Sequence, residues 1–172
     1  LAEHCTDLLL KGFNADIAIL NGGAFRSDIP AGPITLRVME QAYPYKDQIV
    51  VMQLKGSDIL AALEYGIGNN SIGEVRFAGV KLGVDIDLPQ GNRIIENRLT
   101  DNSSIDPNKQ YKVVTNEFLA KGGDGYTTLT KGENIRYAGD IKEFFNFALR
   151  NEKIVNYRAD GRLSIGYLKL AS

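Results

Sequence analysis

The sequence predicts an α+β fold with mixed sheets and packed helices, because strand and helix signals are interleaved irregularly along the chain. Strands are predicted where β-branched and other apolar residues cluster between turn signals, at residues 16–20, 48–54, 81–87, 93–99, 111–115 and 162–165. Helices are predicted where apolar residues recur at helical spacing, at residues 4–10, 36–42, 58–66 and 141–149. The irregular order argues against a doubly wound parallel sheet.

Local signals place the ends of several elements. The first helix is expected to end at Gly12, since glycine is favoured just beyond a helix. Ser57 is expected to cap the helix that follows it. The turn signal at residues 89–92 joins two strands and predicts a hairpin. The segment Asp85 to Pro89 is interpreted as part of that hairpin and not as a calcium loop, because Pro89 offers no ligand side chain.

Composition limits the organisation and the partners. With 172 residues and 44% hydrophobic content, residues 1–172 are expected to form one domain with one core. The net charge is −1 and no run of Lys or Arg is present, so a nucleic-acid polymer is not an expected partner. No segment is apolar enough to predict a membrane span. Because the chain starts without Met, it is expected to be a piece of a longer protein.

Several kinds of chemistry are not supported by the residues present. His4 is the only histidine and Cys5 the only cysteine, so neither a metal pair nor a Ser-His or Cys-His nucleophile is predicted. Residues 66–71 lack the third glycine of a dinucleotide fingerprint, and no phosphate-binding P-loop occurs. The chain is therefore expected to hold no catalytic residue, metal or cofactor of its own.

The segment NGGAFRSDIPAGPIT, residues 21–35, follows a strand that is expected to be buried. Gly22 and Gly23 allow the backbone to turn and to expose amide groups beside Arg26. A guanidinium next to open N–H groups suits a phosphate or a carboxylate. The alternative is a simple strand-to-turn connection in which Arg26 is only solvated.

A second segment, KGGDGY, places the Asp124 carboxylate among three glycines. Such a carboxylate can accept hydrogen bonds from the vicinal hydroxyls of a ribose, or it can satisfy its own backbone in a common turn. Phe118 and Tyr45 are aromatic residues in loops beside predicted strands. Each is either a stacking platform or a core residue.

These segments together carry a family resemblance. NGGAFRSDIPAG, AYPYKD, QIVVMQLKGSDILAALEYGI, SIGE and TNEFLAKGGDGY occur in the order seen in the carboxy-terminal domain of 5′-nucleotidases. The chain resembles that domain over nearly its full length. The family also includes UDP-sugar hydrolases and 2′,3′-cyclic nucleotide phosphodiesterases, and its domain architecture places this domain after a catalytic metallophosphatase domain.

The resemblance implies a nucleotide clamp. Phe118 and Tyr45 would hold the base between two rings, and Asp124 would take the ribose hydroxyls. Arg26, with Asn21 beside it, would contact the phosphate. A divalent metal pair, Zn or Mn or similar, would lie in a covalently linked N-terminal domain, and the parent protein would be extracytoplasmic, in the periplasm, the cell wall or secreted.

Two further positions are implied by the resemblance. Gly73 would let the backbone approach the base, and Asp47 lies where the family offers a group to the base edge. Tyr45 replaces a Phe, and Lys46-Asp47 replaces a Gly-Asn or Gly-Gly pair. An Asp47 carboxylate facing the base would favour guanine, which presents two adjacent donors. In the alternative, Lys46 neutralises Asp47 outside the cleft.

Three functions are compatible with the sequence. The first is the substrate-binding domain of a 5′-nucleotidase-type hydrolase. The second is a stand-alone nucleotide-binding or interaction module without catalysis. The third is a domain with a vestigial clamp that contacts only other proteins.

Overall fold

The computed structural model describes residues 1–29, 31–152 and 154–166. The helices are α1 (Ala2–Phe13), α2 (Leu36–Ala42), α3 (Gly56–Gly66), α4 (Glu117–Ala120) and α5 (Ile141–Glu152). The strands are β1 (Ile17–Leu20), β2 (Gln48–Lys55), β3 (Arg76–Ala78), β4 (Val80–Val84), β5 (Ile94–Leu99), β6 (Gln110–Asn116), β7 (Glu133–Asp140) and β8 (Leu163–Ile165). Short 3-10 turns cover Gly22–Ala24, Gly123–Gly125 and Thr127–Lys131.

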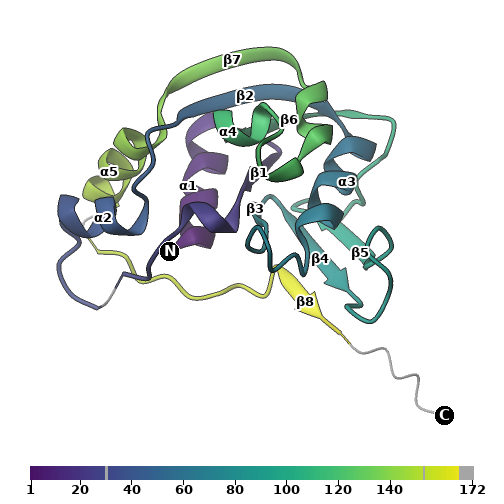
Figure 1. Cartoon of the computed structure of the whole chain (residues 1–172), viewed down its shortest axis with the longest axis horizontal. Coiled ribbons are helices and arrows are strands. Elements are labelled where there is room, and N and C mark those ends of the chain that lie inside the picture. The colour runs from purple at the N-terminus through teal and green to yellow at the C-terminus, as the bar shows by residue number, and fades with distance from the viewer. Residues whose placement is uncertain (30, 153, 167–172) are drawn as a thin grey trace.

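The strands form two mixed sheets, which confirms the predicted α+β class. The larger sheet has the order β3-β1-β6-β2-β7, in which β1 and β6 are parallel and the other neighbours are antiparallel. The smaller sheet has the order β5-β4-β8, with β4 and β5 antiparallel as the hairpin prediction requires. Figure 1 shows α2 and α5 at one end of the molecule and α3 with β4 and β5 at the other.

The central strands of the larger sheet are buried on both faces, so the buried apolar residues form two clusters and not the single core that was expected. Successive residues of a strand point to opposite faces. Ile17 and Ile19 of β1 join a core that includes α3 and β4, whereas Ala18 and Leu20 join a second core that includes α1 and α5. The whole of β1 is therefore buried, which gives the continuous apolar run seen in the sequence.

Several details differ from the sequence-based expectations. The first helix ends at Phe13 and not at Gly12, and Asn14 adopts the left-handed conformation at its C-cap. Ser57 does not cap α3, which begins at Gly56 without a side-chain cap. The backbone N–H groups of Gly56 and Ser57 instead donate to the carbonyls of Lys109 and Pro107, so a distant loop satisfies the helix end. Strands β3 and β7 were not predicted, because β3 has three residues and β7 is an edge strand that is mostly exposed and polar.

Candidate functional site

A cavity of about 790 Å³ lies at one edge of the larger sheet. Because β1 and β6 are parallel, their carboxyl ends meet at this edge, where Asn21 follows β1 and α4 follows β6. Strand β2 is antiparallel to β6 and pairs Ile49 with Asn116, so the segment before β2 reaches the same edge. The fold therefore brings together all seven residues singled out in the sequence, namely Asn21, Arg26, Tyr45, Asp47, Gly73, Phe118 and Asp124.

Tyr45 and Phe118, the two aromatic residues singled out in the sequence, are not core residues. Tyr45 is 42% exposed and Phe118 is 44% exposed. The Tyr45 ring packs edge-on against the buried Tyr43 at 6.3 Å between centroids, and the Phe118 ring lies against Gly123. Each ring is supported from behind and keeps surface available to a ligand.

Asp124 is held by a side chain from another element. Its backbone is left-handed, with φ 54°, and its carbonyl accepts a hydrogen bond from the Tyr65 hydroxyl at 2.9 Å. Its Oδ2 accepts a hydrogen bond from Asn21 Nδ2 at 3.2 Å. Within the described residues, no hydrogen bond from a backbone N–H to this carboxylate is present, so the self-satisfied turn is not the observed arrangement.

Arg26 is exposed beside the Tyr45 ring. Its Cζ lies 5.8 Å from the ring centroid, and its Nη1 donates to the Gly23 carbonyl at 3.3 Å. Its backbone N–H donates to the Ala42 carbonyl at 2.9 Å, which ties the loop after β1 to the end of α2. A guanidinium has five N–H donors, and among the described residues only the bond to Gly23 engages the Arg26 side chain.

Gly73 has a structural reason to be glycine. Its φ is +78°, and a Cβ there would lie 2.7 Å from the backbone nitrogen of Gly23. A Cβ on Gly22 would collide with the carbonyl oxygen of Glu74. The glycines of the two loops thus allow their backbones to pack against each other and form one wall of the cavity.

Asp47 lines the cavity, but its carboxylate is directed to the backbone. Oδ1 accepts a hydrogen bond from the Gln48 N–H at 2.9 Å, and Oδ2 accepts one from the Phe118 N–H at 3.4 Å. Burial raises the pKa of Asp47, and these two backbone bonds oppose the rise. The described part of the structure contains no Lys46–Asp47 ion pair, so the alternative in which Lys46 neutralises Asp47 is not the observed arrangement. Asp47 instead links the Tyr45 segment to the start of α4.

Several residues that line the same cavity were not among the seven predicted site residues: Tyr43, Lys46, Asn70, Ser71, Asn116 and Lys121. The sequence could have indicated a role for Asn116, because Asn before a short helical segment commonly caps the helix. No such signal marked Tyr43. It is fully buried, and burial raises the pKa of its hydroxyl while the Asn116 side chain opposes the rise. The Tyr43 hydroxyl has no hydrogen-bond partner in the described part of the chain.

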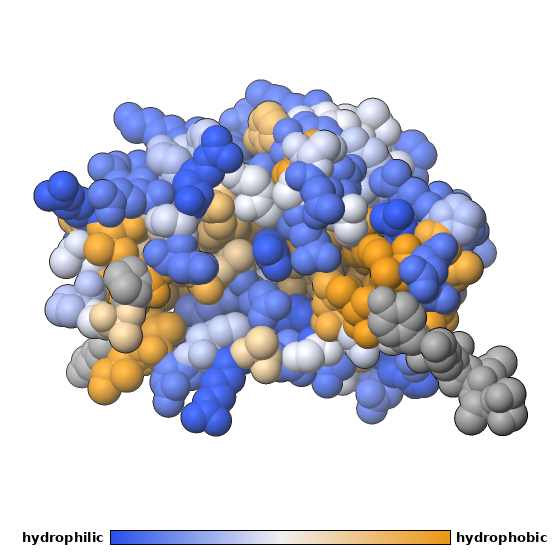
Figure 2. Space-filling view, turned by 60° about the horizontal axis from the view of Figure 1, so that its bottom comes forward, coloured by the Kyte–Doolittle hydropathy of each residue, from blue (hydrophilic) through white to orange (hydrophobic). Residues whose placement is uncertain are grey.

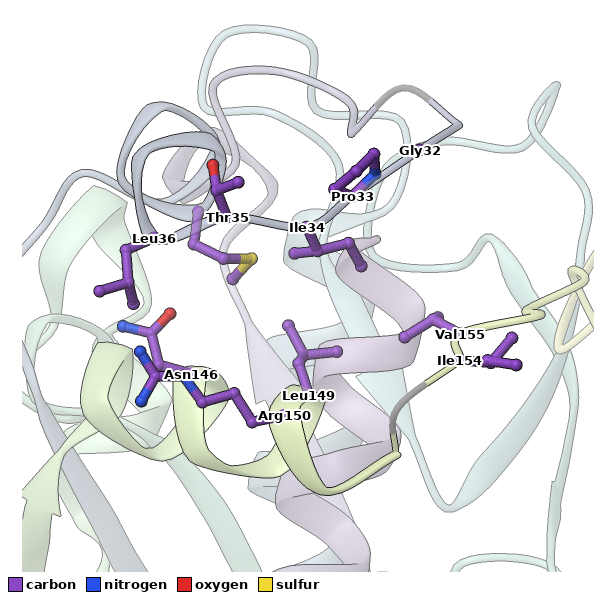
Figure 3. A pocket seen from close by; sticks show the side chains of 11 residues that line it. Gly32, Pro33, Ile34, Thr35, Leu36, Asn146, Leu149, Arg150, Ile154 and Val155 are labelled. Atoms are coloured by element: carbon purple, nitrogen blue, oxygen red, sulfur yellow. The ribbon is translucent and has the colours of Figure 1, made fainter.

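A second cavity, of about 480 Å³, lies between α5 and the segment that leads into α2. Figure 3 shows Ile34 and Leu149 pointing toward each other across it. None of the seven predicted residues lines this cavity. Figure 2 shows hydrophobic residues gathered at this end of the molecule, where Ile34 and Leu36 are exposed, and hydrophilic residues in the middle of the same face.

The described residues offer neither a metal-binding cluster nor a membrane-spanning helix. Among the residues that the structure describes, His, Cys, Asp and Glu form no group of three or more that could hold a metal ion. His4 Nε2 donates a hydrogen bond to Glu152 Oε2 at 2.7 Å, away from the cavity. No helix in the described ranges has the length and apolar character needed to cross a bilayer.

Comparisons with known proteins agree with this geometry. Residues 1–131 match the family described as 5′-nucleotidase, C-terminal domain. The chain is 32% identical over 164 residues to the trifunctional nucleotide phosphoesterase protein YfkN of Bacillus subtilis, which covers 90% of this chain and 11% of that protein. The chain belongs to the 5′-nucleotidase C-terminal domain family.

Solved structures give the same result. A 5′-nucleotidase precursor from Thermus thermophilus superposes with a TM-score of 0.89 and 32% identity, covering 95% of this chain and 34% of that one. The NAD nucleotidase of Haemophilus influenzae superposes with a TM-score of 0.82 at 19% identity, which shows the shared fold. The chain thus spans about a tenth to a third of the length of the proteins it matches. It is the C-terminal domain of a larger protein.

Proposed function

We propose that residues 1–172 act as one substrate-binding domain that holds a nucleotide for hydrolysis by another part of the same protein. The observation that carries this proposal is the convergence of two half-exposed rings, a held carboxylate and an exposed guanidinium on one cavity. A volume of about 790 Å³ is within the range of small-molecule sites, about 300–1,000 Å³. The names of the relatives, nucleotide phosphoesterase and 5′-nucleotidase, support the same class of ligand.

Each group of a nucleotide has a matching residue. The base stacks between Tyr45 and Phe118, and the ribose hydroxyls donate to Asp124. The phosphate accepts hydrogen bonds from Arg26, with Asn21 beside it. Gly73 keeps the cavity wall close to the base, and Asp47 holds the Tyr45 and Phe118 segments together. These residues bind and orient, and none of them is placed to act as a nucleophile.

Hydrolysis requires groups that the described residues do not supply. We place a divalent metal pair in a linked N-terminal metallophosphatase domain, where it would activate water. In this arrangement Arg26 helps to keep the phosphate in line for attack. We also place the parent protein outside the cytoplasm, in keeping with its relatives, which include a Listeria monocytogenes protein named as a cell wall protein and venom 5′-nucleotidases.

Isothermal titration of the 172-residue chain with adenosine and with AMP tests the proposal. Phe118→Ala is expected to weaken binding of both ligands by about 1–3 kcal/mol, because one stacking face is lost. Phe147→Ala is the matched control, since Phe147 is 68% exposed and does not line the cavity.

The proposal fails if the folded wild-type chain binds neither ligand, or if Phe118→Ala and Phe147→Ala have equal effects on affinity. Phosphate release from AMP by the isolated chain with added Zn²⁺, Mn²⁺ or Mg²⁺, above that of a mock preparation, would contradict the placement of catalysis in another domain.

A further inference from the structure

Asn116 is buried next to the cavity, and both the oxygen and the nitrogen of its side-chain amide form hydrogen bonds. It ends β6, is 1% exposed, and was not among the residues singled out in the sequence. Its Oδ1 accepts a hydrogen bond from the Leu119 backbone N–H at 3.2 Å, which caps α4. Its Nδ2 donates to Asn21 Oδ1 at 3.2 Å. A side chain with two buried hydrogen bonds in different directions has one fixed orientation.

The backbone amide of Leu119 sets the direction of a chain of hydrogen bonds. A backbone N–H can only donate, so the Asn116 atom that faces it must be the oxygen. The Asn116 nitrogen then faces Asn21, and Asn21 must present its oxygen in return. The nitrogen of Asn21 is thereby turned toward Asp124 Oδ2, where it donates at 3.2 Å. The orientation of each amide follows from the previous one.

We propose that Asn116 is a positioning residue that prepares Asp124 for the ribose hydroxyls, acting through Asn21. This inference rests on the proposed function. Because Asn21 engages Oδ2 of Asp124, the other oxygen, Oδ1, is left to accept from the ligand. The left-handed backbone of Asp124 adds to the need for an external support, since a non-glycine residue in that conformation carries strain.

Asn116→Asp separates the two roles of this side chain. The substitution keeps the shape and keeps an oxygen for the Leu119 N–H, but it replaces the donor that faces Asn21 with an acceptor. The amide of Asn21 is then expected to turn over and to present its oxygen to Asp124, which breaks the support of that carboxylate.

The measurement is the ratio of the affinities for adenosine and 2′,3′-dideoxyadenosine, which differ only in the ribose hydroxyls. In the wild-type chain adenosine is expected to bind more tightly. Asn116→Asp is expected to reduce this advantage by about tenfold, the loss of one hydrogen bond to a charged group. Affinity for 2′,3′-dideoxyadenosine itself is expected to change by less than about twofold, because the stacking rings are not affected.

Asn97→Asp is the matched control. Asn97 Oδ1 also accepts a hydrogen bond from a backbone N–H, that of Ile105 at 2.7 Å, but Asn97 does not line the cavity. Asn116→Ser provides a second variant if Asn116→Asp does not fold. A serine can cap α4, but it is too short to reach Asn21, so the same loss of ribose dependence is expected.

The outcomes separate this inference from the function on which it rests. If the wild-type chain binds no nucleoside, the proposed function fails. If it binds adenosine and the folded Asn116 variants keep the full ratio of affinities, the positioning role is overturned. It is also overturned if the variants weaken both ligands equally, because Asn116 would then serve only the fold.

Discussion

Arg162 and Arg26 show two opposite uses of the same side chain. Arg162 is 5% exposed, and its guanidinium donates to groups on several elements: Thr6 Oγ1, the Phe77 carbonyl, Asp7, Tyr157 and Asp160. Arg26 is exposed and donates from one nitrogen to one carbonyl. A guanidinium whose donors are all engaged serves the fold, whereas one with free donors beside a cavity is available to a ligand.

The regions around these two arginines differ in the same way. Arg162 lies just before β8 and ties this end of the chain to α1 through Asp7 and Thr6. The cavity instead collects polar groups that are only partly engaged, such as Asp124, Arg26 and the buried hydroxyl of Tyr43. Of these groups only the Tyr43 hydroxyl is buried, where an unpaired polar group costs stability, whereas Arg26 and Asp124 remain accessible to water.

The largest expected effect is the loss of stability on removal of the Arg162 side chain. Arg162→Ala should lower the free energy of unfolding by about 3–5 kcal/mol, because it leaves buried and partly buried partners unpaired. The effect is expected near the lower end, since Asp7 and Asp160 are partly solvated and recover water. Urea denaturation followed by circular dichroism measures it.

Arg26→Ala should change the free energy of unfolding by less than about 1 kcal/mol, because it loses only two exposed contacts, with the Tyr45 ring and with the Gly23 carbonyl. It should instead remove about 1.5–3 kcal/mol of the advantage of AMP over adenosine in titrations. Arg37→Ala, another exposed arginine that does not line the cavity, is the control. Equal losses of stability in the Arg26 and Arg162 variants would remove the distinction between the two regions.

The sequence predicted the cavity residues better than it predicted the sheets. Asn21, Arg26 and Asp124 stand in short segments whose glycines and polar residues are unusual at the end of a buried strand, so the pattern is local. Strand β7 has no such pattern, because an edge strand with exposed faces looks like a polar loop.

Contacts between residues far apart in the sequence could not be predicted from the sequence either. Asp47 is bonded to Phe118, 71 residues away, and Asn116 to Asn21, 95 residues away. The expected role of Asp47 at the base edge assumed a free carboxylate. Only the pairing of β2 with β6 reveals that two backbone N–H groups occupy it.

Two glycine substitutions, compared with each other, test whether the cavity wall depends on close backbone packing. Gly73→Ala should be more destabilising than Gly91→Ala by about 1–3 kcal/mol, because the added methyl group must displace the Gly23 backbone. Gly91 is a matched control, since its φ of +100° imposes a similar strain but a Cβ there meets nothing within 4 Å. Thermal unfolding of both variants separates the contact from the strain. Equal losses would show that the two loops give way to each other easily.

The smallest expected effect concerns the hydroxyl of Tyr43. The ring is fully buried and packs against Phe25, Tyr45 and Phe145, so Tyr43→Phe keeps these contacts. Because the hydroxyl has no partner in the described residues, its removal should leave the free energy of unfolding unchanged or raise it by up to about 1 kcal/mol. Urea denaturation without ligand measures this.

If the cavity keeps this hydroxyl for a ligand, the same variant should bind adenosine more weakly although it is no less stable. A loss of stability with unchanged affinity would instead mean that Asn116 or a water molecule satisfies the hydroxyl, and Tyr43 would then resemble Arg162 and not Arg26.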